Sequence, residues 1–263
     1  MVVDVIDNWF LVVGLINLFL FIFGLFFFLP KKIFKTTFLE YYKFFSSNFK
    51  FLIIILIVVI IHLLEVNFVD SYITDLLGLD FTESISLIEN GVVFWFSQNW
   101  NYFLVVFFVI MYIAVYPFIL WFSPLYFLLT DDKKALKTLA YGLFLIYVVA
   151  LPFYLFFPVT NVFTFYGVES ALEWVIPGVN EFFYSTTTFN NCLPSLHVAM
   201  TLLIAKSVFI TKNKKYTYFV YFCAISVIIS VIYLAIHWII DVMFGIILAF
   251  TVFYLQKRFI TED

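Results

Sequence analysis

The sequence carries little charge. Asp, Glu, Lys and Arg make up only 12% of its 263 residues, whereas about one-quarter of a typical soluble domain is charged. Hydrophobic residues make up 65%, including 39 Phe, 17 Tyr and 6 Trp, and a soluble fold could not bury so many aromatic side chains. This shortage of charge excludes an ordinary cytosolic enzyme and a disordered chain, and it indicates a polytopic membrane protein.

Cysteine and arginine are also scarce. Two cysteines, Cys192 and Cys223, are too few for a disulfide framework, and we expect no bridge between a loop cysteine and one inside an apolar run. The single arginine is Arg258, and the basic residues form no face outside short loops. We therefore expect no binding of nucleic acid. The sequence contains no internal repeat, no low-complexity linker and no soluble domain.

Long apolar runs predict the architecture. A spanning helix needs about 20 apolar residues, and we find seven candidates: Trp9–Leu29, Phe51–Phe68, Tyr102–Leu129, Thr138–Pro158, Ser195–Thr211, Tyr216–Ile236 and Trp238–Gln256. We predict an all-α membrane bundle of about seven transmembrane helices. Pro117 and Pro124 predict a kink or an early end of the third helix near Ser123.

The runs divide the chain into four parts. Residues 1–68 hold two transmembrane helices, and 69–101 is predicted to form short amphipathic helices lying at the membrane interface. Residues 102–256 form a transmembrane core, and 257–263 form a tail.

The distribution of positive charge predicts the orientation. All but one of the 14 Lys and Arg lie in segments 30–50, 130–137, 212–215 and 257–263. Segments 69–101 and 159–194 have neither Lys nor Arg but carry several Asp and Glu. Because basic loops stay inside, we expect the N-terminus outside, the C-terminus in the cytoplasm, and the cell membrane as the location.

Three histidines stand out in so apolar a chain, because ionisable residues inside membranes are costly and usually functional. The predicted topology places His197, His237 and Asp241 near the outer surface. His62, with Glu65, lies near the outer end of the second helix, and we interpret that pair as structural.

The spacing of His237 and Asp241 suits nucleophilic chemistry. Residues four apart share one helix face, so Asp241 can accept a hydrogen bond from one ring nitrogen of His237 and leave the other free to attack. Ser195 is expected to cap the fifth helix. The free N–H groups at that helix end suit a phosphate.

These residues together resemble the type 2 phosphatidic acid phosphatase (PAP2) superfamily. Pro194, Ser195 and His197 match its P-S-x-H motif, while Ser230, His237 and Asp241 match its following motif in spacing. Cys192-Leu193-Pro194-Ser195-Leu196-His197 and His237-Trp238 look most like the inositol-phosphorylceramide synthase branch. The resemblance covers roughly residues 99–256 and implies a six-helix core.

Two features depart from the superfamily pattern. Val231 stands where the third motif usually has arginine, and the Lys- and Arg-bearing first motif is absent. The synthase branch also tends to lack these cations. Ser195, Ser230, backbone N–H groups and Asn191 are the candidates for binding the substrate.

The resemblance implies a double displacement that needs neither metal nor cofactor. His237 would attack phosphorus, His197 would protonate the leaving group, and Asp241 would orient His237. Water would then take the phosphoryl group from His237 and release phosphate, or an acceptor alcohol such as inositol would take it. The expected substrate is a lipid phosphate or diphosphate entering from the bilayer. The alternatives are a headgroup transferase like inositol-phosphorylceramide synthase, and a non-catalytic lipid transporter or scaffold.

Overall fold

The computed structural model describes residues 3–184 and 187–259, and helices dominate them. Within these ranges the chain forms no strand, only an isolated bridge between Val159 and Asn191. The helices are α1 (Val3–Phe27), α2 (Phe38–Leu64), α3 (Asp70–Leu77), α4 (Thr82–Glu89), α5 (Val92–Gln98), α6 (Tyr102–Ile110), α7 (Tyr116–Leu129), α8 (Lys133–Phe156), α9 (Val162–Phe165), α10 (Ala171–Val175), α11 (Val179–Tyr184), α12 (Leu196–Ile210), α13 (Lys214–Tyr233) and α14 (Ile239–Phe259).

Five of the described helical stretches are long and apolar enough to cross a membrane. They are Phe38–Leu77, Tyr102–Leu129, Lys133–Phe156, Lys214–Tyr233 and Ile239–Arg258. Two further apolar helices, Leu11–Phe27 and Leu196–Ile210, are shorter. The prediction of an all-α membrane bundle is therefore confirmed, and each of the seven predicted runs overlaps one of these helices.

The second helix begins earlier than predicted, at Phe38 rather than Phe51. Thr37 and Glu40 form a capping box, in which the Thr37 hydroxyl accepts from the Glu40 N–H and the Glu40 carboxylate accepts from the Thr37 N–H. Such a box satisfies two otherwise unpaired helix-end donors. A polar first turn can thus start a helix well ahead of its apolar run.

Of the kink or early end predicted near Ser123, the early end does not occur, because α7 continues to Leu129, where the predicted run also ends. A π-helical turn over Met111–Val115 joins α6 to α7 just before Pro117. Pro124 is accommodated inside α7, and the neighbouring Ser123 hydroxyl donates to the Ile119 carbonyl at 2.6 Å.

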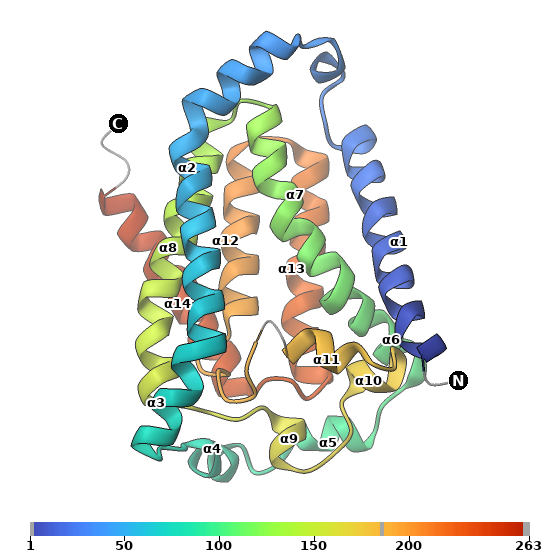
Figure 1. Cartoon of the computed structure of the whole chain (residues 1–263), viewed down its shortest axis with the longest axis vertical. Coiled ribbons are helices and arrows are strands. Elements are labelled where there is room, and N and C mark those ends of the chain that lie inside the picture. Colours follow the sequence, from blue (N-terminus) through green and yellow to red (C-terminus); the bar gives the residue numbers. More distant parts are fainter. Residues whose placement is uncertain (1–2, 185–186, 260–263) are drawn as a thin grey trace.

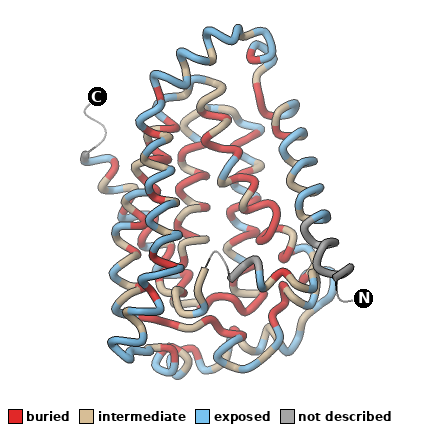
Figure 2. Tube along the Cα trace, in the orientation of Figure 1, coloured by how far each residue is buried: buried red, intermediate tan, exposed pale blue. Residues whose placement is uncertain are grey.

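Helix α12 lies at the centre of the bundle and packs against α7, α8, α13 and α14 (Figure 1). Helix α2 packs on α8 and α7, and α1 stands at the opposite side against α7. Buried residues concentrate on α7, α12 and α13 and in the loops at the lower end of the view, while the described part of α1 is mostly exposed (Figure 2).

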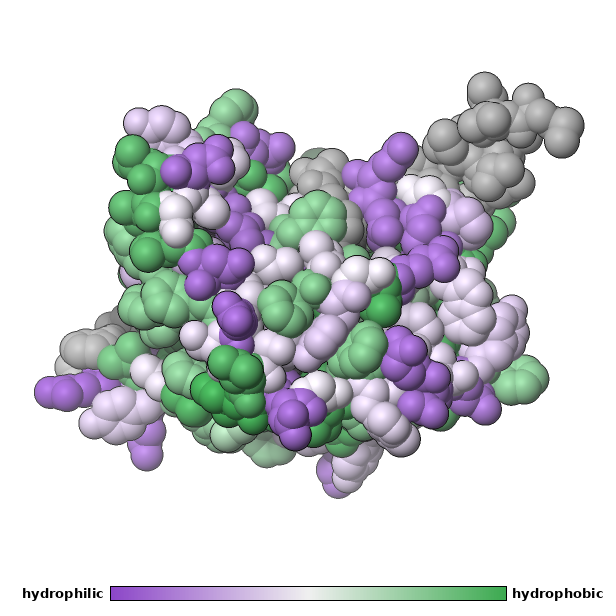
Figure 3. Space-filling view, turned by 90° about the horizontal axis from the view of Figure 1, so that it is seen from below, coloured by the Kyte–Doolittle hydropathy of each residue, from purple (hydrophilic) through white to green (hydrophobic). Residues whose placement is uncertain are grey.

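The two ends of the bundle differ. The turns between α1 and α2, α7 and α8, and α12 and α13 gather at one end, and the short helices α3, α4, α5, α9, α10 and α11 gather at the other (Figure 1). The short helices expected in 69–101 are present, although α3 continues α2 through a π turn over Glu65–Val69. Seen from that end, hydrophilic and hydrophobic side chains are interspersed (Figure 3).

Candidate active site

His237 lies in the tight turn between α13 and α14. The N–H groups of Ile236 and His237 both donate to the Val231 carbonyl, which closes the turn onto the end of α13. Ala235 adopts φ 55° here, a left-handed conformation that costs a non-glycine residue about 1–2 kcal/mol. Strain of this kind persists only where surrounding contacts hold it, so the turn places the His237 ring firmly.

Asp241 lies in the first turn of α14, whereas His237 precedes the helix, so the two side chains meet across the helix start and not on one helix face as predicted. Its Oδ2 lies 3.3 Å from His237 Nδ1 and accepts from the Trp238 N–H at 2.9 Å. The Asp241 carboxyl is fully buried and His237 is 4% exposed. This contact leaves Nε2 of His237 as the nitrogen free to act as a nucleophile.

His197 lies in the first turn of α12, close to the turn between α13 and α14 that carries His237. Its ring centroid is 5.7 Å from that of His237. The backbone joins the two motifs as well, because the Ser195 N–H donates to the Asp241 carbonyl at 3.0 Å. The structure thus brings together His197, His237 and Asp241, whose grouping was predicted from sequence.

The predicted substrate-binding residues occupy different positions. Ser195 stands at the N-cap position of α12, but its side chain makes no capping hydrogen bond, and its buried Oγ has no partner among the described residues. Asn191 lines the cavity beside the histidines. Ser230 is buried and donates to the Val227 carbonyl at 2.8 Å, outside the residues that line the cavity.

A cavity of about 610 Å³ is lined by both His197 and His237. Polar lining residues include His62, Tyr112, Tyr147, Asn191, His197 and His237. Much of the remaining lining is apolar and comes from α1, α2 and α7, with Val13, Ile55, Val59, Leu120 and Trp121 among it. A cavity with a few polar groups in a largely apolar lining fits an amphipathic molecule with a small polar head.

Sequence reasoning missed the role of Glu65. Its side chain is 3% exposed; Oε1 accepts from the Asn191 amide at 2.8 Å, and Oε2 accepts from the Tyr147 hydroxyl at 3.0 Å. Glu65 therefore ties α2 to α8 and to the loop that precedes the P-S-x-H motif. The available signal was a carboxylate inside a long apolar run, which is a functional hypothesis by default.

Tyr112 was also missed. Its hydroxyl lies 3.0 Å from His197 Nε2, and the two ring centroids are 4.8 Å apart. Tyr112 lies in the π turn between α6 and α7, and such turns often occur at functional sites. A sequence of apolar runs contains no signal for a π turn, so only the structure reveals this contact.

The segment 69–101 contacts the start of α14 and the loop before α9. Glu89 of α4 accepts from the Ile240 N–H at the start of α14 at 2.8 Å, and Thr82 accepts from the Thr160 N–H at 2.8 Å. Burial, reinforced by the nearby charge of Asp241, raises the pKa of Glu89. The Glu89 contact holds segment 69–101 against α14, the helix that carries Asp241.

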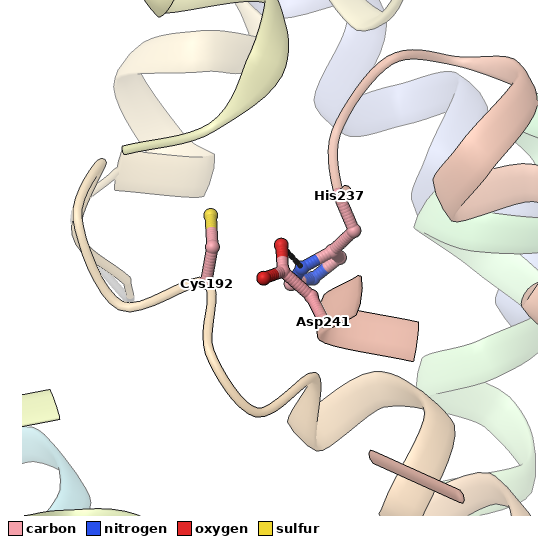
Figure 4. A group of neighbouring side chains, drawn as sticks. All are labelled: Cys192, His237 and Asp241. Carbon is pink, nitrogen blue, oxygen red and sulfur yellow. Dashed lines mark hydrogen bonds and ion pairs between the residues drawn. The ribbon is translucent and has the colours of Figure 1, made fainter. Parts of the chain in front are cut away.

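Cys192, His237 and Asp241 form a compact group (Figure 4). One ligand atom from each lies within 4.8 Å of the others, a set that could hold a metal ion. A metal needs the thiolate form of cysteine, but burial raises the pKa of the Cys192 thiol well above its usual value. Asp241 is moreover engaged with His237 and the Trp238 N–H.

Comparison with known proteins agrees with the motif assignment. The family model described as the PAP2 superfamily matches residues 154–262, which is less than half of the chain. No curated protein and no solved structure matches the chain. The matched segment, which contains His197, His237 and Asp241, is thus similar to the PAP2 superfamily, whose members are generally phosphatases or phosphotransferases.

Proposed function

We propose that the protein is a membrane-embedded, metal-independent phosphatase or phosphotransferase that acts on a lipid phosphate or diphosphate. The observation that carries this proposal is the pair of histidine rings 5.7 Å apart, one of them held by Asp241, in the lining of a largely apolar cavity. A phosphate lying between the two rings would leave its lipid chain along the walls built by α1, α2 and α7.

The reaction has two displacement steps. Nε2 of His237 attacks phosphorus, the bond from phosphorus to the lipid oxygen breaks, and His197 gives that oxygen a proton. Asp241 balances the charge that develops on His237. A water oxygen then attacks phosphorus, the bond to Nε2 breaks, and the water's proton passes to His197. The products are free phosphate and the dephosphorylated lipid.

An alcohol in place of water would make the protein a headgroup transferase. Asn191 supports this second candidate, because its buried Oδ1 has no partner among the described residues and can accept from an acceptor hydroxyl. The likeness of the P-S-x-H region to inositol-phosphorylceramide synthases points to inositol as the acceptor to test.

The proposed location follows from the charge pattern. The basic turns lie at the end of the bundle opposite the site, so the positive-inside rule puts the site at the outer face of the cell membrane with the C-terminus in the cytoplasm. Substrate would enter from the outer leaflet between helices.

The deciding experiment uses the purified full-length protein in detergent. Phosphatidic acid, a polyprenyl diphosphate and a phospholipid are supplied in EDTA, with and without inositol, beside His237→Ala. Ser207→Ala is the control, since Ser207 donates to the Leu203 carbonyl within α12, away from the site. We expect phosphate release, or an inositol-containing product, that requires His237 and persists in EDTA. Loss of turnover in EDTA, or turnover by His237→Ala, would contradict the mechanism, and no turnover of any lipid would favour a transporter or scaffold.

A further inference from the structure

The cavity presents a charge problem that the catalytic residues do not solve. A phosphate monoester carries more than one negative charge at neutral pH, and an anion away from bulk water needs a partner of opposite charge. None of the described residues that line the cavity is Lys or Arg. Only its three histidines, His62, His197 and His237, can carry positive charge there.

Two of these histidines cannot keep a positive charge through the first step. His237 must be neutral at Nε2 to attack, and His197 gives its proton to the leaving oxygen. The remaining histidine is His62 of α2, which lines the same cavity as His197 and His237. Its charge can persist from binding to product release.

The surroundings of His62 fit this task. Nδ1 of His62 lies 3.8 Å from Oε2 of Glu65, and the His62 ring meets the Tyr147 ring nearly edge-on, with centroids 5.7 Å apart. Its side chain is 32% exposed, so a ligand in the cavity can reach it. Glu65 holds Tyr147 and Asn191 in turn, which fixes the wall that carries the imidazole.

We propose that His62 is the group that receives the negative charge of the substrate's phosphate, in place of the absent lysine and arginine. This inference rests on the proposed function and deepens it, because it names the anchor for the phosphate. His62 binds as the imidazolium, a form that an incoming phosphate stabilises. Its role is in holding the phosphate, and the bond-making and bond-breaking remain with His197 and His237.

The test separates binding from turnover. Binding is measured as the rise in the thermal midpoint of the purified protein with a non-hydrolysable lipid phosphonate, with diacylglycerol as the uncharged control. His62→Gln keeps the size and polarity but not the charge, whereas His62→Arg keeps the charge. Leu64→Gln is the matched control, because Leu64 is close to His62 in the chain, is 50% exposed and is not among the residues that line the cavity.

We expect the phosphonate to stabilise the wild type, His62→Arg and Leu64→Gln but not His62→Gln. Loss of one charged hydrogen bond should raise KM of His62→Gln for phosphatidic acid by about tenfold or more, with a smaller change in kcat. Equal stabilisation of wild type and His62→Gln would overturn the proposal. So would equal loss in His62→Gln and His62→Arg, which would indicate a packing role, or a wild type that the phosphonate does not stabilise.

The two proposals fail in different ways. Stabilisation by the phosphonate that depends on the charge at position 62, without turnover of any lipid phosphate, would support His62 as an anion site and contradict the enzymatic function. Turnover that needs His237 but does not change with the residue at position 62 would support the enzymatic function and contradict His62 as the anion site.

Discussion

His197 and His237 lie in different surroundings, and the difference separates their roles. His237 has a carboxylate on Nδ1, which stabilises a positive ring and leaves Nε2 to attack. His197 has the phenol of Tyr112 on Nε2 and the ring of Tyr116 at 5.0 Å, and no carboxylate of the described residues forms a hydrogen bond with it. Two histidines with unlike neighbours suit a nucleophile and a general acid.

An acid role for His197 predicts a dependence on the leaving group. His197→Ala should slow hydrolysis of phosphatidic acid, whose alkoxide needs a proton, by about 10²–10⁴-fold. It should slow 4-nitrophenyl phosphate much less, because nitrophenolate leaves without protonation. The measurement is kcat for both substrates. Equal slowing of the two would count against the acid role.

Tyr112 is predicted to position the His197 ring. Tyr112→Phe removes one hydrogen bond worth about 0.5–1.5 kcal/mol, so kcat should fall about two- to tenfold with little change in KM. Tyr116→Phe is the matched control, because its hydroxyl contacts only the Met200 sulfur, at 3.5 Å. A similar fall in kcat in both variants would contradict a specific role of Tyr112, because loss of either hydroxyl near His197 would then have the same effect.

At the scale of elements, the site depends on how closely α14 approaches the start of α12. Gly245 makes this approach possible, since a Cβ there would lie 2.6 Å from the Ser195 carbonyl oxygen and 3.1 Å from Val198 Cβ. The same contact brings the Ser195 N–H to the Asp241 carbonyl. One glycine thus sets the distance between the two motif-bearing helices.

Gly245→Ala should therefore lower stability despite the better helix propensity of alanine. We expect an overpacking cost of about 1–3 kcal/mol, against a propensity gain of about 1 kcal/mol, and a loss of activity as the end of α12 is displaced. The measurement is the thermal midpoint in detergent together with turnover. Gly14→Ala in α1 is the control: no atom lies within 4 Å of its added Cβ, so stability should hold or rise slightly. An unchanged midpoint and rate in Gly245→Ala would show that α14 can shift freely.

At the scale of the whole molecule, the N-terminal helices are part of the site. Helix α2 contributes His62 to the cavity, the π turn that follows it contributes Glu65 to the support of Asn191, and α1 contributes Val13 and Asn17 to the lining of the cavity. The division into two N-terminal helices and a transmembrane core therefore describes the sequence, but it does not separate the N-terminal helices from the cavity. The PAP2 superfamily match begins only at residue 154, so α2 brings groups that lie outside the matched segment.

Removal of the Glu65 carboxylate should weaken this connection. Glu65→Ala leaves the Asn191 amide and the Tyr147 hydroxyl without their acceptor, at a cost of about 1–3 kcal/mol for each donor that stays buried. We expect a lower thermal midpoint and a lower kcat/KM, because the loop before the P-S-x-H motif loses its anchor. Leu64→Ala, at a neighbouring residue that is 50% exposed, should change neither. A Glu65→Ala variant with wild-type activity would show that α2 only covers the site.

The sequence by itself determined the membrane bundle, the approximate place of its helices and the grouping of His197, His237 and Asp241. The reason is local: a bilayer demands continuous apolar runs, and four residues of chain keep Asp241 within reach of His237 even though His237 precedes α14. The start of α2 at Phe38 was missed, because a capping pair is invisible to hydropathy.

Only the tertiary structure decided which polar groups meet around the catalytic histidines. Tyr112 reaches His197 across 85 residues of chain, and Asn191 reaches Glu65 across 126. Such pairs carry no periodic pattern, because each side chain is placed by a different helix and the contact depends on how those helices pack. A buried polar group must find a partner wherever packing provides one, and that choice is made in three dimensions.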